Sequence, residues 1–212
     1  MYALTFDGTD GVAVNKLVVS AYDLANASYD SVSFSLTSEE GNPYDLVFNN
    51  DGTKMYVLGA TDTVHQYTLS TAYDVSTASY ASKEFSVATQ ESAPNGLAFN
   101  NDGTKMYIVG STNDTVYQYT LSTAEDVSTA SYDSVSLSIT AQEASPQGIV
   151  FNNDGTKMFI VGASGDSVYE YTLSTGFDVS TASFVDSFSV SAQDLNLKAI
   201  CYHNQKWIVK YL

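Results

Sequence analysis

Ten residues that occur three times offer the first candidate chemistry in this chain. The sequence FNNDGTKMYV begins at Phe48, and close copies of it begin at Phe99 and Phe151. Its asparagine and aspartate side chains present oxygen atoms, which are the ligands that calcium prefers. The calcium-loop pattern D-x-[DN]-x-[DN]-G, however, would place an oxygen ligand at Val47 and a glutamate at Leu58, and neither residue fits. Asn-Asp-Gly between two apolar runs is typical of a hairpin, so we predict a turn here and no metal site.

The other residue types that catalyse reactions are few and scattered. His65 stands where other copies of the repeat have Tyr117 and Tyr169, and His203 lies in a turn of a different unit, so we expect neither a shared metal nor a catalytic pair. The single cysteine, Cys201, lies in an apolar run and is expected to pack as a small hydrophobic residue. The chain has no G-x-S-x-G motif, and its serine-rich segments alternate with apolar residues as solvated strands do. We predict no catalytic residues and no enzymatic activity.

A third group of polar residues recurs once per repeat, in short segments rich in acidic and amide side chains. These segments read SEEGNP, QESAP, QEASP and QDLN, and a further aspartate recurs in three of the units. Gathered on one surface, such side chains would bind a cation or form hydrogen bonds with a sugar. The alternative is a solvated acidic rim. The candidates are Glu39, Glu40, Asp62, Gln90, Glu91, Asp114, Gln142, Glu143, Asp166, Gln193 and Asp194. We predict no cofactor.

The repeat period defines the elements that must position these residues. Asp51, Asp102 and Asp154 are 51 and 52 residues apart. Four antiparallel strands in a unit of this length are typical of a blade of a β-propeller, whereas a parallel β-helix would have shorter coils and a sandwich would not need close copies. One helical turn capped by Asp126 is also expected. The expected strands of one unit cover residues 96–99, 105–109, 115–121 and 131–139.

We predict one all-β domain over residues 1–212, a four-bladed β-propeller of four-stranded antiparallel blades. The first blade would combine residues 1–37 with 197–212, so that both chain ends close the ring. The run Tyr2–Phe6 is one strand more than this ring needs, and it would extend a blade edge or pair with another subunit. An open array that closes only in an oligomer is the alternative. Complete blades are expected at residues 44–87, 95–139 and 147–190.

The expected blades place the acidic segments. In a propeller, the loops that connect successive blades and the loops between the second and third strands of each blade emerge on the same face. The eleven candidates would therefore form a ring on that face, with the Asn-Asp-Gly hairpins on the opposite one. We expect function to reside on the candidate face, where the copies of the repeat differ.

Composition and charge exclude several classes of protein. The chain carries 24 acidic residues against eight lysines and no arginine, for a net charge of −16. Binding to nucleic acid or to an anionic membrane depends on basic side chains, so neither partner is predicted. No apolar run is long enough for a transmembrane helix, and the first residues lack the features of a signal peptide. We expect a chain made without a secretion signal of the usual kind, or one whose signal has been removed.

The blade pattern resembles a known group of repeats. It reads P-x-G-[IL]-x-F-N-N-D-G-T-K-M-[YF]-[IV]-[VL]-G, followed by V-Y-x-Y-T-L-S-T. This pattern is similar to the YVTN/lactonase-like propeller repeats of bacteria, and closest to the tandem propeller repeats of marine bacteriophage and environmental bacterial proteins. The resemblance covers nearly the whole chain. It departs in blade number, because the usual members have seven blades or more, and in lacking the arginine and histidine set of the lactonase branch.

The resemblance implies a structural or interaction role. We expect a component of a phage virion, such as a tail, fibre or surface-decoration protein, located on the virion or an extracellular surface. Its partners would be other virion or surface proteins, a host receptor or a glycan, with no nucleic acid and no membrane insertion. Multiple copies would raise avidity, and the strand Met1–Phe6 would support a homo-oligomer. The alternatives are a lectin-like glycan-binding propeller and a lactonase-like enzyme.

Overall fold

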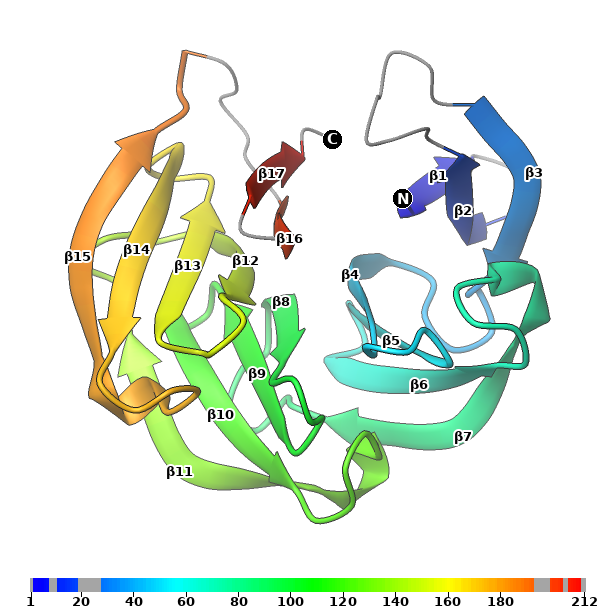
Figure 1. Ribbon diagram of the computed structural model, residues 1–212, viewed down its shortest axis with the longest axis horizontal. Coiled ribbons are helices and arrows are strands. Elements are labelled where there is room, and N and C mark those ends of the chain that lie inside the picture. The colour runs from blue at the N-terminus through cyan, green and yellow to red at the C-terminus, as the bar shows by residue number, and fades with distance from the viewer. Residues whose placement is uncertain (1, 8–10, 19–27, 193–198, 204–205, 211–212) are drawn as a thin grey trace.

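The computed structural model describes residues 2–7, 11–18, 28–192, 199–203 and 206–210, with side chains from 28 to 192. Within these ranges the chain is all-β, and its only helical elements are three short 3₁₀ turns. No helix in the described ranges is long and apolar enough to cross a membrane. Three four-stranded antiparallel sheets follow one another around a centre, each with its first strand inside and its last strand outside (Figure 1).

The three complete sheets confirm the predicted blades. The first consists of β4 (Pro43–Phe48), β5 (Lys54–Gly59), β6 (Thr63–Leu69) and β7 (Ala78–Ser86). The second consists of β8 (Pro94–Phe99), β9 (Lys105–Gly110), β10 (Thr115–Leu121) and β11 (Ala130–Ser138). The third consists of β12 (Pro146–Phe151), β13 (Lys157–Gly162), β14 (Ser167–Leu173) and β15 (Ala182–Ser189). We call the four strands of a blade A to D from the inside outward.

Two smaller sheets flank this array. At the N-terminal end, β1 (Tyr2–Asp7), β2 (Gly11–Val18) and β3 (Ser28–Ser35) form a three-stranded sheet. At the C-terminal end, β16 (Ala199–His203) and β17 (Lys206–Lys210) form a hairpin, and β16 packs beside β12 in the position of an inner strand. With β3, β7, β11 and β15 as outer strands, the arrangement is consistent with the predicted four blades.

The terminal sheets bear on two details of the prediction. The first strand lies at the edge of the N-terminal sheet, where β1 pairs with β2 from Tyr2 opposite Lys16 to Asp7 opposite Gly11. A hairpin of neighbouring segments forms at little entropic cost, which explains why this local pairing satisfies the strand. His203 belongs to β16 and not to a turn. Within the described ranges, β1–β3 and β16–β17 are separate sheets, so a blade completed by both chain ends stays a prediction.

The repeated Asn-Asp-Gly segment is a hairpin turn, as predicted. In the first copy, Phe48 pairs with Met55 and Gly52 adopts φ +72°, a conformation that a side chain disfavours. The Asp51 carboxylate accepts hydrogen bonds from the amide and the hydroxyl of Thr53, and these bonds lower the Asp51 pKa. One carboxylate oxygen of Asp51 is therefore used by the turn itself.

At each interface between blades, the C strand of one blade and the 3₁₀ turn that follows this strand pack against the preceding blade. These turns are η2 (Val75–Thr77), η3 (Val127–Thr129) and η4 (Val179–Thr181), and their valines are fully buried. Asp126 caps η3 by accepting a hydrogen bond from the amide of Ser128, which confirms the predicted cap. Each turn packs against the D strand of the preceding blade, so that the hydrophobic core lies between blades.

Candidate functional site

Three buried glutamates connect the two loops of the predicted ligand face. Glu40, Glu91 and Glu143 lie in the D–A loops, and each is at most 1% exposed. The Glu143 carboxylate accepts hydrogen bonds from the amides of Ser145 (2.8 Å), Ser164 (3.0 Å) and Gly165 (3.0 Å), and from the Ser164 hydroxyl. Ser164 and Gly165 belong to the B–C loop, so one carboxylate holds both loops. We call this arrangement the glutamate latch.

The other two blades carry the same latch. Glu40 accepts from the amides of Asn42 (2.8 Å) and Thr61 (3.1 Å), and Glu91 accepts from the amides of Ala93 (2.9 Å) and Thr112 (3.0 Å). The glycine that ends each B strand lies directly against the latch glutamate of its blade. An added Cβ at Gly59, Gly110 or Gly162 would overlap the side chain of the latch glutamate.

The predicted solvated rim is therefore wrong for these three glutamates. Backbone amides of a loop need acceptors, and one buried carboxylate satisfies several of them at once. Their neighbours are also engaged, because Glu39, Gln90 and Gln142 accept weak hydrogen bonds of 3.3–3.4 Å from tyrosine hydroxyls on the C strands. Ligand binding by the predicted ring stays a prediction.

Three aspartates complete the described part of the predicted ring. Asp62, Asp114 and Asp166 have positive φ of 53°, 46° and 45°, and their carbonyl groups accept 2.8 Å hydrogen bonds from the amides that end the D strands. Burial, followed by the charges of Glu143 and Glu91, raises the Asp114 pKa. Burial and the charges of Glu91 and Glu40 raise that of Asp62 in the same way. The charges of the latch glutamates thus act on Asp62 and Asp114. Gln193 and Asp194 lie outside the described residues.

His65 is a packed side chain of this face. It is 5% exposed, its Nε2 lies 3.2 Å from the Thr61 hydroxyl, and its ring lies edge-on to Tyr80. The same Thr61 hydroxyl donates a 2.7 Å hydrogen bond to Glu40, so His65 supports the latch of its blade. Among residues 28–192, no group of three His, Cys, Asp or Glu side chains could hold a metal ion. The side chains of Cys201 and His203 lie outside the described part.

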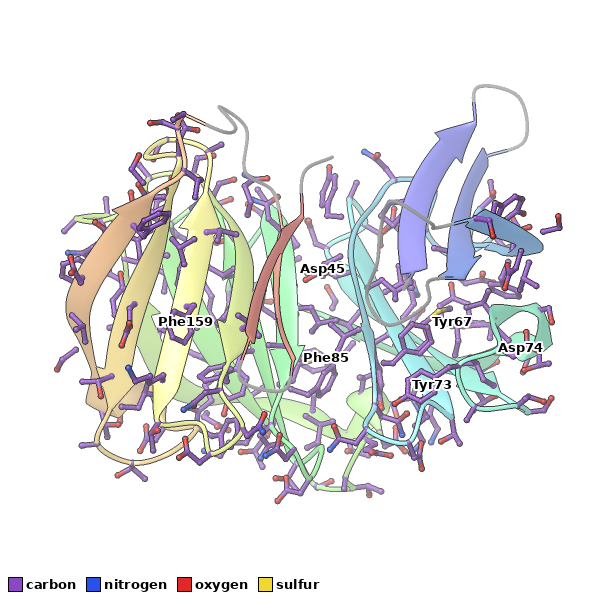
Figure 2. All side chains as sticks on the ribbon, turned by 45° about the horizontal axis from the view of Figure 1, so that its top comes forward. Asp45, Tyr67, Tyr73, Asp74, Phe85 and Phe159 are labelled. Carbon is purple, nitrogen blue, oxygen red and sulfur yellow. The ribbon has the colours of Figure 1, made fainter. Side chains whose placement is uncertain are left out.

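The inner strands also differ between blades. Asp45 stands where the next blades have Gly96 and Gly148, and it lies on the side of β4 that faces the neighbouring blade (Figure 2). Its carboxylate accepts 2.8 Å hydrogen bonds from the amides of Leu46 and Leu97. An acidic side chain at the centre is therefore used to join two A strands.

The opposite face, which carries the hairpins, contains a hollow that sequence reasoning missed. Its volume is about 180 Å³, and it lies between the blade of β4–β7 and the blade of β8–β11. The rings of Tyr56 and Phe99 stack in its lining with centroids 4.5 Å apart. The signal in the sequence was the Asn-Asn pair, which repeats on adjacent hairpins. The lining residues are Val47, Phe48, Asn49, Asn50, Tyr56, Phe99, Asn100, Asn101, Gly103 and Glu125.

Glu125 gives this hollow a polar wall that the next pair of blades lacks. Its carboxylate accepts hydrogen bonds from Asn49 Nδ2 (3.1 Å) and Lys54 Nζ (2.6 Å), and both charged side chains are about a quarter exposed. Between the next two blades the corresponding residue is Phe177, whose ring contacts Phe151. The exchange of Glu125 for Phe177 is therefore a chemical difference between two copies of the repeat, and it lies at the wall of the hollow.

The fold and its repeated contacts define a β-propeller, and solved structures have the same fold. A periplasmic gluconolactonase of Pseudomonas aeruginosa is 14% identical, with a TM-score of 0.59 over 89% of this chain and 50% of its own. A protein of unknown function from Desulfotomaculum acetoxidans is 15% identical, with a TM-score of 0.57 over 89% of this chain and 52% of its own. A Lactobacillus plantarum protein is 13% identical, with a TM-score of 0.57 over 89% and 55%.

These comparisons establish the β-propeller fold of the protein. The chain spans about half the length of the solved structures that it matches. No described protein family and no curated protein matches the sequence. The fold is therefore shared at low sequence identity, and function has to be argued from the residues of this chain.

Proposed function

We propose that the protein is a non-enzymatic propeller that acts as an interaction scaffold. The observation that supports this function is the glutamate latch, since Glu40, Glu91 and Glu143 accept hydrogen bonds from the backbone of both loops of a blade. Loops that are held in this way keep their shape without a ligand, and a preorganised surface binds a partner at a smaller cost in conformational entropy. The three buried glutamate carboxylates thus bind the backbone of the loops.

The proposed setting is the surface of a virion. It rests on the resemblance of the repeat to the tandem propeller repeats of marine bacteriophage. The partners would be neighbouring virion proteins or a receptor on the host, and many copies on one particle would bind with high avidity even if each contact were weak. Fluorescently labelled protein should then bind saturably to some members of a panel of marine bacteria, in competition with unlabelled protein. A complete lack of binding across the panel would count against this setting.

An enzyme assay tests the non-enzymatic part of the proposal. Purified protein should not accelerate the hydrolysis of gluconolactone beyond the rate in buffer. Turnover that increases in proportion to the protein concentration, and that persists through an additional purification step, would overturn the proposal in favour of a lactonase-like enzyme. Glu143→Ala should leave the background rate unchanged, because the latch carboxylate is assigned to the loop backbone.

A glycan is the second candidate partner, and the hollow beside Glu125 favours it. Asparagine amides and an acidic group form hydrogen bonds with sugar hydroxyls, while aromatic rings such as Tyr56 and Phe99 contact the apolar face of a sugar ring. Hexoses and N-acetylhexosamines, titrated to millimolar concentration, should perturb the amide signals of residues 99–103 in NMR spectra. Glu125→Phe, which copies Phe177 of the next blade, should abolish the perturbation. A wild-type spectrum that no sugar changes would exclude this candidate.

A further inference from the structure

The same interface is built three times between consecutive blades. A ring or aliphatic side chain on each D strand meets a tyrosine on the C strand of the following blade. Phe34 and Tyr67 lie 5.6 Å apart between ring centroids, and Phe85 and Tyr119 lie 5.5 Å apart. Leu137 is the corresponding D-strand residue of the next blade, and it packs in the core that contains Tyr171. Figure 2 shows where Tyr67 and Phe85 lie in the first complete blade.

Further contacts join consecutive blades. The 3₁₀ turns η2, η3 and η4 pack against β3, β7 and β11 respectively, and the valine of each turn is fully buried. At the interfaces made by η3 and η4, a glutamine on the C strand of the preceding blade accepts a hydrogen bond from the amide of the turn valine. Gln66 accepts from Val127 (3.0 Å), and Gln118 accepts from Val179 (3.1 Å).

The outer strand β15 carries the D-strand side of this interface, and the residue at the contact position is exposed. Phe188 pairs with Val168 in the register that pairs Leu137 with Val116, so it occupies the position that the next blade would bury. Phe188 is 71% exposed, more than any other large hydrophobic side chain in residues 28–192. Phe184 of the same strand belongs to the other face of the sheet, because its ring contacts Tyr171, which packs toward the preceding blade.

An acceptor also occupies the corresponding position on the last complete blade. Glu170 stands at the position of Gln66 and Gln118. One oxygen of its carboxylate accepts a hydrogen bond from Lys157 Nζ, and the other can accept from a backbone amide. In the preceding blades the equivalent residues Phe34, Phe85 and Leu137 pack against a core, so the exposed Phe188 marks a surface that a partner can cover. The contacts already present between blades identify the matching surface, which is the C-strand side of another blade.

The N-terminal sheet offers that matching surface. In the described chain no outer strand precedes β2, whereas every later C strand has one before it. Leu17 of β2 pairs with Tyr29 in the register that pairs Tyr67 with Tyr80, so an apolar residue occupies the position of the interface tyrosine. The sheet β1–β3 lies at the far end of the array from β15 (Figure 1).

We propose that β15 of one copy binds the β1–β3 sheet of a second copy, head to tail. The contact would extend the series of blade interfaces across two molecules, with Phe188 and Glu170 on one side and β2 on the other. Such a heterologous contact forms a closed ring when its rotation allows closure, and a chain of subunits when it does not. The protein would then assemble through the surface that already joins its own blades.

Sedimentation at several concentrations tests this proposal with the full chain. The wild-type protein should show masses at multiples of 22.8 kDa that increase with concentration. Phe188→Ser should remain folded, because the residue is largely exposed within one copy, and should weaken association at least about tenfold, the order of loss expected when a buried aromatic anchor is removed. Tyr44→Ser removes an aromatic side chain that is 45% exposed on β4, and it should not change association.

Mixing two variants distinguishes the head-to-tail contact from other arrangements. Phe188→Ser alters one surface and Leu17→Ser alters the other, so at concentrations where the wild type is largely associated each variant alone should be mostly monomeric. Equal amounts of the two should form a dimer and no larger species, because each mixed pair has a single intact interface. A wild-type protein that stays at 22.8 kDa at all concentrations would overturn the proposal, as would a Phe188→Ser variant that associates normally. If Leu17→Ser does not fold, the Phe188→Ser comparison still decides.

Discussion

Replacing Glu143 by alanine is expected to lower the free energy of unfolding by about 3–5 kcal/mol. The wild-type carboxylate accepts from three backbone amides and one hydroxyl, and a hydrogen bond to a charged acceptor contributes roughly 1.5–3 kcal/mol. Ser164 and Gly165 are exposed, so water would satisfy their amides after the change, and the loss would be smaller than the full sum. Glutamine at this position keeps one acceptor oxygen but turns a donor toward Gly165, which should cost about 1–3 kcal/mol.

Urea unfolding followed by circular dichroism measures this loss, and hydrogen exchange locates it. The amides of Ser145, Ser164 and Gly165 should exchange faster in the alanine variant, while the amides of the β-strands keep their relative order of protection. The matched control is Gln142→Ala, because Gln142 is the adjacent residue and accepts only a 3.3 Å hydrogen bond from Tyr171.

The control should change the free energy of unfolding by less than about 1 kcal/mol, since a weak neutral hydrogen bond contributes little. Equal losses for the Glu143 and Gln142 variants would show that the carboxylate does not hold the loops. Unchanged exchange at Ser164 and Gly165 would refute the latch even if the protein were destabilised, because the loss would then arise elsewhere.

Two further substitutions test the charge interactions of the loops and the packing between blades. Asp114→Asn should stabilise the protein at neutral pH, because burial and the charges of Glu143 and Glu91 raise the Asp114 pKa and thus disfavour its ionised form in the folded state. The gain should shrink as the pH falls through that raised pKa, where the wild-type carboxyl group is already neutral, and urea midpoints at several pH values measure it. Val127→Ala should cost about 2–3 kcal/mol by leaving a cavity under β7, whereas the exposed neighbour Ser128→Ala should cost much less.

The blades could be predicted from the sequence because each repeat contains a hairpin that is stabilised by residues close together in the chain. Phe48 and Met55 flank a turn whose residues satisfy their own backbone groups, so this hairpin depends on neighbours within ten positions. The predicted blade at 44–87 matches strands that run from Pro43 to Ser86. The pairing of the first strand was harder to predict, because Tyr2–Phe6 resembles a B strand and the sequence shows two segments of that type.

The burial of the latch glutamates could not be read from local sequence. Segments such as QESAP have the composition of a solvated loop, and the partner of Glu91 at Thr112 lies 21 residues away on another loop. One signal was available, since each latch glutamate recurs with a glycine at the end of the following B strand, as Glu91 does with Gly110. The hollow beside Glu125 was missed for a similar reason, because it forms between two blades and belongs to neither repeat alone.

The hydrogen bonds between blades have a consequence for how such a chain can change length. Tyr56 donates to the carbonyl group of Glu125, and Tyr107 donates to that of Phe177, so the same link is made regardless of the side chain that follows. Each blade therefore requires only backbone groups and a few fixed positions from its neighbour, and repeat stabilities of this kind are approximately additive. A gene that duplicates or loses one repeat unit would encode a longer or shorter array in which every junction is already compatible.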